Sequence, residues 1–372
     1  MKIISKIVSL VMAAVLGVFS FAVSFGRLPR GERLQRIKNS PNYSGGGFQN
    51  QPQPDELPGE PPGGQPVGKS SLANTIATLF SKTADLRPSK PLPAVKTDLW
   101  QLDRGEDILV WMGHDALFLQ IDGIRFLLDP TLVMGSPVSF AKKAFPAVYA
   151  YTPDDIPDVD YLLISHDHWD HLDYRTVHSL RERIGTVVCG LGVGEHFEYW
   201  KFPKNKIVEL DWDESVSFGG LTIHVLPARH ATNRMLISNK TLWVSFLLET
   251  PSMTIFISGD TGYGVHIPEI GRKFPNIDLA VMENGQYDEK WKNSHMLPDG
   301  LVRAIKDLNP ERVFTMHHAK YDLANHTWKA PLENIAAAAA EESFDLLTPM
   351  MGEVAYLKDK LQTFTQWWVD AK

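Results

Sequence analysis

The chain has 372 residues, of which 44% are hydrophobic and 10% aromatic, so it can bury a large core in one main domain. It contains one cysteine, Cys189, which excludes an intramolecular disulfide and a cysteine-rich zinc finger. The formal net charge is −7, and the first 38 positions hold seven basic residues and one acid. The rest of the chain is therefore acidic, and no nucleic-acid substrate is expected.

An apolar segment stands near the start of the chain. Residues 7–25 carry no charge and follow Lys2 and Lys6, which is typical of a signal peptide or a membrane anchor over residues 1–26. Small residues at 22–24 would suit cleavage, whereas five basic residues between 27 and 38 oppose simple export. We expect membrane association through this segment, with export to the periplasm or cell envelope after cleavage as the alternative.

Residues 27–70 are interpreted as a basic flank followed by a tether. Seven prolines and seven glycines lie between positions 40 and 68, with runs at 45–47 and 61–64. Such a composition favours a linker over a packed core. The catalytic domain is therefore expected over residues 71–372.

Short strands and helices alternate in the folded body. Strands over 117–121 and 124–128 are expected to form a hairpin through Asp122-Gly123, and a helix over 173–183 is expected to begin at an Asp173 cap. The other expected strands are 108–112, 161–165, 186–189, 222–226, 242–248, 254–258, 279–282 and 313–316, and the other helices are 299–308 and 332–342. This pattern predicts the α/β (α+β) class, with two mixed sheets packed face to face and flanked by helices, an αββα sandwich.

A run of histidine and aspartate follows the strand that is expected to end at Ser165. The run is His166-Asp167-His168-Trp169-Asp170-His171, and its loop position lets side chains 166, 168, 170 and 171 turn toward one centre. This arrangement suits two adjacent ions of the zinc type. The run therefore predicts a metal-dependent hydrolase.

Two coordination shells need more ligands than this run supplies. His230, Asp260 and His317 each follow an apolar strand and could reach the same centre. Asp260 lies in the turn Gly259-Asp260-Thr261-Gly262, where glycine permits a sharp bend and the carboxylate could bridge two cations.

These motifs resemble those of the metallo-β-lactamase superfamily, and later segments are similar to its branch of N-acylphosphatidylethanolamine-hydrolysing phospholipases D. The resemblance extends over about residues 33–357, through the run at 166–171 and shorter runs at 36–43, 111–114, 128–130, 209–212, 259–263 and 323–325. It implies an αββα sandwich of the metallo-β-lactamase type.

The resemblance also implies a set of seven metal ligands: His166, His168 and His230 for one ion, Asp170, His171 and His317 for the other, and Asp260 as the bridge. The family usually has Trp-Gly after the last histidine, whereas this chain has His318-Ala319. His317 and His318 therefore both stay candidates for that ligand.

Four residues receive further roles from the resemblance. Asp170 would orient the attacking hydroxide in addition to binding metal, and His295 would stabilise charge or protonate the leaving oxygen. His114 and Asp129 would orient ligating imidazoles through hydrogen bonds.

The implied reaction is hydrolysis of a phosphodiester. Two zinc ions per chain are expected, with iron or manganese as alternatives, and a metal-bound hydroxide would convert N-acylphosphatidylethanolamine to N-acylethanolamine and phosphatidic acid. Two alternatives stay open: a metal-dependent hydrolase of a lactone, an ester or another small phosphodiester, and a metal-binding scaffold or sensor without turnover. The expected partners are a phospholipid or other phosphodiester and a membrane surface, with a homodimer as a candidate assembly.

Overall fold

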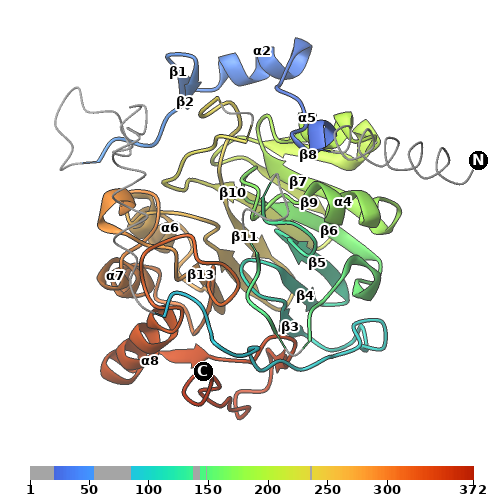
Figure 1. Cartoon of the computed structure of the whole chain (residues 1–372). Helices are drawn as coiled ribbons and strands as arrows, with labels where there is room; N and C mark the ends of the chain where they lie inside the picture. The colour runs from blue at the N-terminus through green and yellow to red at the C-terminus, as the bar shows by residue number, and fades with distance from the viewer. Residues whose placement is uncertain (1–20, 54–84, 137–142, 148, 235–236) are drawn as a thin grey trace, which may run out of the picture.

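The computed structural model describes residues 21–53, 85–136, 143–147, 149–234 and 237–372 (Figure 1). Most of the apolar segment at 1–26 and part of the tether at 54–70 lie outside these residues. Within the part of the chain that is described, no helix is long and apolar enough to cross a membrane. Membrane association through the N-terminal segment therefore stays a prediction.

The first sheet has seven strands in the order β16-β3-β4-β5-β6-β7-β8. Their bounds are β3 (Ile108–Trp111), β4 (Leu117–Ile121), β5 (Ile124–Leu128), β6 (Val159–Ile164), β7 (Ile184–Gly190), β8 (Ile207–Leu210) and β16 (Val354–Tyr356). The expected hairpin is confirmed: Ile121 pairs with Ile124, and Asp122 and Gly123 have the positive φ angles of 50° and 77° that tight hairpin turns favour. Strands β5 to β8 run parallel.

The second sheet has seven strands in the order β15-β14-β13-β12-β11-β10-β9. Their bounds are β9 (Ser215–Phe218), β10 (Leu221–Leu226), β11 (Ser245–Glu249), β12 (Thr254–Ile257), β13 (Leu279–Glu283), β14 (Arg312–Met316) and β15 (Asp345–Leu347). Strands β9 to β12 are antiparallel, and β12 to β15 are parallel. Both sheets are therefore mixed.

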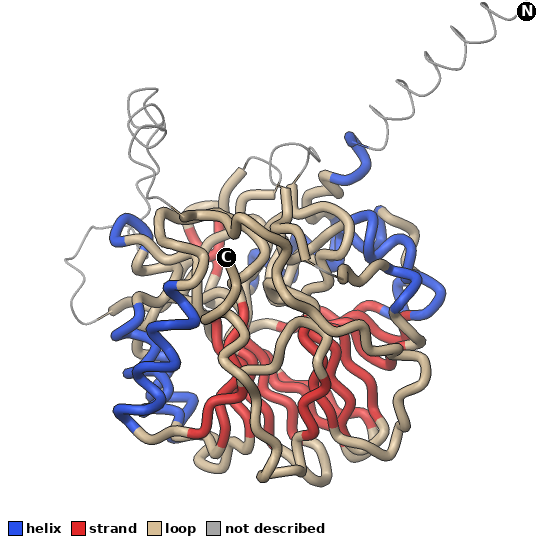
Figure 2. Tube along the Cα trace, turned by 60° about the horizontal axis from the view of Figure 1, so that its bottom comes forward, coloured by secondary structure: helices blue, strands red, loops and turns tan. Residues whose placement is uncertain are grey.

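Helices cover the outer face of each sheet (Figures 1 and 2). Helices α4 (Tyr174–Leu180) and α5 (Gly194–Tyr199) flank the first sheet, and α6 (His266–Lys273), α7 (Pro298–Leu308) and α8 (Ala330–Glu342) flank the second. One buried cluster joins Leu119 and Phe126 of the first sheet to Ile223 and Phe246 of the second, so the main core lies between the sheets. This arrangement confirms the predicted αββα sandwich.

Several elements differ from the expectation. Helix α4 has the expected cap, because Asp173 accepts the backbone N–H of Arg175, but it gives way to a 3₁₀ turn after Leu180. The strand expected over 242–248 begins at Ser245.

Part of the segment interpreted as a flank and tether packs on the body. Residues 27–53 contain helix α2 (Gly31–Asn39) and the hairpin of β1 (Tyr43–Ser44) and β2 (Gly47–Phe48). Ile37 and Phe48 are buried in the main core, which explains how a proline- and glycine-rich stretch acquires a fixed position. The boundaries of the three predicted segments themselves stay predictions.

Candidate metal centre

The predicted ligands follow strands of both sheets. The loop 166–171 follows β6 in the first sheet, whereas His230, Asp260 and His317 follow β10, β12 and β14 in the second. Because the carboxyl ends of the parallel strands meet at one edge of each sheet, packing of the two sheets brings these loops together. All seven side chains reach one buried site at this edge.

The turn before Asp260 requires glycine. Gly259 has a φ angle of 56°, and a Cβ atom there would lie 2.9 Å from Cβ of Ser165 and 2.8 Å from the carbonyl oxygen of Val244. A side chain at this position would therefore push the Asp260 turn away from the loop 166–171.

Three histidines and Asp260 form the first cluster. The potential ligand atoms of His166, His168, His230 and Asp260 all lie within 4.8 Å of one another. His230 Nε2 is 3.2 Å from Nδ1 of His168, and Oδ2 of Asp260 is 3.8 Å from Nε2 of His166 and 3.7 Å from Nε2 of His230. The set matches the first of the two metal positions implied by the sequence.

Asp260 also contacts the second group of predicted ligands. Its Oδ2 atom is 3.2 Å from Nε2 of His171 and 3.4 Å from Nε2 of His317. Each of these two nitrogens is 4.0 Å from Oδ2 of Asp170. Asp260 therefore occupies the position between the two groups that a bridging carboxylate requires.

The choice between His317 and His318 depends on the backbone after β14. His317 has a φ angle of 69° and directs its ring toward Asp260 and Asp170. His318 points elsewhere: its Nε2 is 3.2 Å from the carbonyl oxygen of Thr315, and its ring packs on Trp111 at 4.9 Å between centroids. The structure thus places His317, and not its neighbour, with the other predicted ligands.

The electrostatics of the cluster fit divalent cations. Among the residues that the structure describes, Nε2 of His166, Nε2 of His317 and Oδ1 of Asp260 are buried without a hydrogen-bond partner. Burial lowers the pKa of His166 and His317 well below its usual value, which favours the neutral imidazole that binds metal. Buried donor atoms without partners are costly unless a cation meets them, so this donor set fits two metal ions.

A second layer of residues fixes the orientation of these rings. Asp129 lies 2.9 Å from Nδ1 of His171 and accepts the backbone N–H and hydroxyl of Ser165. His114 Nε2 lies 3.0 Å from Oδ2 of Asp170. Asp129 therefore contacts a ligating imidazole as expected, whereas His114 contacts the carboxylate of Asp170 and not an imidazole.

His295 lies at the edge of the centre with its side chain 15% exposed. Its ring stacks on His317 at 5.1 Å between centroids, and its Nδ1 is 3.3 Å from Oε2 of Glu283 and 4.0 Å from Oδ2 of Asp260. Burial lowers the pKa of His295. Glu283 itself is fully buried and accepts the backbone N–H groups of Thr261 and Met296.

Sequence reasoning missed Glu283 and two other acidic residues at or near the loop 166–171. Glu283 ends the apolar strand β13, which is the same signal that identified Asp260 and His317. Asp115 follows His114 and is fully buried. Asp167 lies within the run itself, where it contacts His196 at 3.0 Å and accepts the hydroxyl of Thr241 at 2.8 Å.

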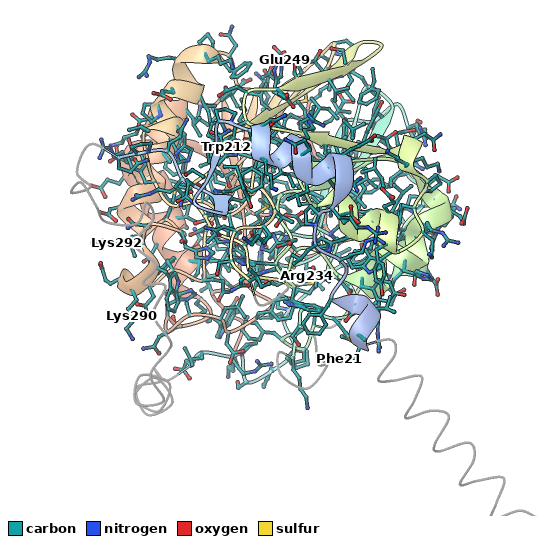
Figure 3. All side chains as sticks on the ribbon, turned by 90° about the horizontal axis from the view of Figure 1, so that it is seen from above. Phe21, Trp212, Arg234, Glu249, Lys290 and Lys292 are labelled. Atoms are coloured by element: carbon teal, nitrogen blue, oxygen red, sulfur yellow. The ribbon has the colours of Figure 1, made fainter. Side chains whose placement is uncertain are left out.

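Residues 21–53, which we call the N-terminal strap, contact two parts of the centre. Asn50 accepts the backbone N–H of His230 at 3.0 Å and donates to its carbonyl oxygen at 2.9 Å. Arg234 donates to the carbonyl oxygens of Asp167 and Ser24, and its guanidinium lies 4.0 Å from the ring of Trp169. Figure 3 labels Arg234 and Phe21 on the same side of the molecule, where the strap enters the described structure.

Comparisons with known proteins point to one family. Residues 124–318 match the β-lactamase superfamily domain. An uncharacterised protein of Mycobacterium tuberculosis is 33% identical over 324 residues, which cover 85% of this chain and 84% of that protein. N-acyl-phosphatidylethanolamine-hydrolyzing phospholipase D 1 of Caenorhabditis elegans is 31% identical over 287 residues, covering 69% of this chain and 78% of that one.

A solved structure supports the fold. Igni18, a metallo hydrolase from the archaeon Ignicoccus hospitalis, superposes with a TM-score of 0.52 at 18% identity, covering 67% of this chain and 97% of that one. At this identity the likeness concerns the arrangement of sheets and helices.

Proposed function

Because the chain belongs to the β-lactamase superfamily and is a metal-dependent hydrolase of the metallo-β-lactamase fold, we propose that it cleaves a phosphodiester, with N-acylphosphatidylethanolamine as the substrate. The products are N-acylethanolamine and phosphatidic acid. The relative from Caenorhabditis elegans carries this activity in its name and supports the substrate.

One observation carries the proposal. Six predicted ligands, from loops of both sheets, surround the seventh, Asp260, in one buried site. Asp260 Oδ2 lies 3.2 to 3.8 Å from Nε2 of four histidines, namely His166, His171, His230 and His317. Two divalent cations held by this set would supply Lewis-acid chemistry, lowering the pKa of a water molecule and offsetting the charge of the phosphodiester. A scaffold without turnover could hold metal with the same donor set, so measured turnover is what separates the two functions.

Asp170 and His295 are the groups that we assign to proton handling. His114 holds one carboxylate oxygen of Asp170 at 3.0 Å, which fixes the direction in which this carboxylate can accept a proton from the attacking water. Burial raises the pKa of Glu283 well above its usual value, so its carboxylic acid can donate to Nδ1 of the neutral His295 ring. The ring proton is then on Nε2, the atom that can donate it to the leaving alkoxide oxygen. Glu283 is thus a positioning residue for His295.

The test uses the purified full chain, reconstituted with zinc or manganese and assayed on N-acylphosphatidylethanolamine in mixed micelles. We expect release of both products, and a loss of about 10² to 10⁴ in kcat for Asp170→Asn, because a positioned acid or base contributes this much. The matched control is His224→Gln in β10, whose side chain pairs with Glu249 outside the centre.

Two other results would contradict the proposal. Metal-dependent hydrolysis of a lactone or another ester, with no turnover of the phospholipid, would identify the small-substrate alternative. Bound metal without hydrolysis of any of these substrates would identify a scaffold or sensor.

A further inference from the structure

Asp115 is a buried carboxylate to which the ligand assignment gives no role. It lies between β3 and β4, directly after His114, and its side chain is fully buried. Its Oδ2 atom is 3.4 Å from Nε2 of His114 and 3.8 Å from Nε2 of both His171 and His317. The potential ligand atoms of these four residues all lie within 4.8 Å of one another.

The hydrogen bonds of the site leave this carboxylate unsatisfied. Neither oxygen of Asp115 has a hydrogen-bond partner among the residues that are described, and the same holds for Nε2 of His171 and Nε2 of His317. A buried ionised carboxylate without a partner is costly, so such a group stays ionised in a folded protein only where a cation faces it. Here the atoms that face it are two nitrogens already assigned to the second metal ion.

The position of Asp115 is fixed by the backbone. The turn before it has positive φ angles of 88° at Gly113 and 54° at His114. His114 donates its backbone N–H to the carbonyl oxygen of His318 at 3.2 Å, and His317 donates its backbone N–H to the carbonyl oxygen of His114 at 3.2 Å. These two hydrogen bonds join the loop of Asp115 to the loop of His317, so the position of the carboxylate relative to the imidazole is fixed.

We propose that Asp115 is an additional ligand of the second metal ion, a proposal that rests on the two-metal centre of the proposed function. The second ion then has three carboxylates, from Asp115, Asp170 and Asp260, together with His171 and His317. The first ion has three imidazoles and shares Asp260. Tetrahedral zinc suits the first set, whereas an oxygen-rich set of five donors suits a harder ion of higher coordination number, such as manganese or iron.

The test measures bound metal per chain by mass spectrometry, for the full-length protein equilibrated with chelator-buffered Mn²⁺ or Zn²⁺. We expect the wild type to bind two ions. In Asp115→Ala the second Mn²⁺ should bind at least about 100-fold more weakly, since even residues outside the coordination shell contribute 10- to 100-fold. The affinity for the second Zn²⁺ should fall less, because the four remaining donors are enough for tetrahedral zinc.

The control variant is Asp122→Asn, which removes one negative charge at the far end of β4 and suits the positive φ of that position. It should leave both affinities unchanged. Equal affinity of wild type and Asp115→Ala for the second Mn²⁺ would overturn the inference. A wild type that never binds a second ion would instead refute the two-metal centre itself.

A second measurement separates ligation from a structural role. In the metal-free state, the isosteric variant Asp115→Asn should have a Tm equal to or above that of the wild type, because it removes a buried ionisable carboxyl that has no hydrogen-bond partner among the described residues. Its gain in Tm on adding Mn²⁺ should be smaller than that of the wild type. A metal-free variant that melts below the wild type and gains as much from Mn²⁺ would contradict the inference.

Discussion

At the scale of single residues, hydrogen bonds decide which ring nitrogen of a histidine is available to metal. Asp129 lies 2.9 Å from Nδ1 of His171, and the carbonyl oxygen of Ser294 lies 3.0 Å from Nδ1 of His230. A ring that donates its Nδ1–H to an acceptor presents an unprotonated Nε2 to the centre. The two acceptors therefore orient one ligand of each proposed ion.

Asp129→Asn should weaken the second metal site. The amide keeps the shape of the carboxylate but cannot accept all the hydrogen bonds that Ser165 and His171 donate, so the His171 ring loses its fixed orientation. We expect metal affinity to fall about 10- to 100-fold, as for other residues that orient ligands. Chelator competition measures this change, with Asp103→Asn on the exposed surface as the control. Unchanged affinity would show that His171 is oriented without Asp129.

At the scale of elements, the N-terminal strap joins parts of the centre that belong to different sheets. Arg27 donates its backbone N–H to Nδ1 of His196, whose Nε2 contacts Asp167 in the metal-binding loop of the first sheet. At its other end, Asn50 binds the backbone of His230, which follows a strand of the second sheet. The strap therefore connects both sides of the candidate site across the top of the sandwich (Figure 1).

Asn50→Ala should loosen the loop that carries His230. The substitution removes the amide partner of the backbone N–H and carbonyl of His230, at a cost of about 1–3 kcal/mol for each buried group that stays unsatisfied. The indole N–H of Trp243 keeps its other acceptor, the carbonyl oxygen of Ala228. We expect a lower free energy of unfolding and weaker binding of the first metal ion. Urea unfolding and metal titration measure the two effects.

Gln35→Ala is the matched control, because Gln35 lies on the exposed face of α2 and contacts Asn39 of the same helix. Gln35→Ala should change neither the free energy of unfolding nor the affinity for the first metal ion. If both variants behave alike, Asn50 does not position the ligand loop.

At the scale of the whole molecule, burial in the packed sandwich keeps some histidines neutral at acidic pH, where a histidine in water is charged. His266 at the start of α6 is fully buried, and burial, with a smaller effect of the Arg229 charge, lowers its pKa to about 3. Between about pH 6.5 and pH 3 the unfolded chain binds a proton that the folded chain does not. The free energy of unfolding therefore falls as the pH falls through this range.

We expect His266 to remove about 2 kcal/mol of stability when the pH is lowered from 7 to 5. Urea unfolding at both pH values, in the presence of chelator so that metal release does not contribute, measures the total change. In His266→Gln the change should be smaller by about this amount. An equal change in both proteins would show that His266 takes up no proton on unfolding.

Local sequence patterns predicted the parts of the fold that local interactions decide. The hairpin of β4 and β5 followed from two apolar runs around Asp122-Gly123, and the cap at Asp173 followed from its side chain. Edge strands such as β8 and β9 and the short helix α5 were missed because their residues are mixed in polarity or few in number. The strap was missed because its buried residues are few: Ile37 stands among basic residues, and Phe48 stands in a stretch rich in glycine and proline.

The sequence by itself determined the chemistry of the centre, because the run at 166–171 places four donors within six residues and needs no distant partner to be recognised. Tertiary structure decided between the distant candidates and brought in residues that the sequence did not indicate. The ring of His317 and not that of His318 faces the centre, and Asp115 and Asn50 come from segments without a local signal. Glu283 ends an apolar strand, but only the packing shows that its carboxylate lies beside His295. The convergence of these residues depends on the packing of two sheets and on backbone turns, and these arise from contacts between residues far apart in the chain.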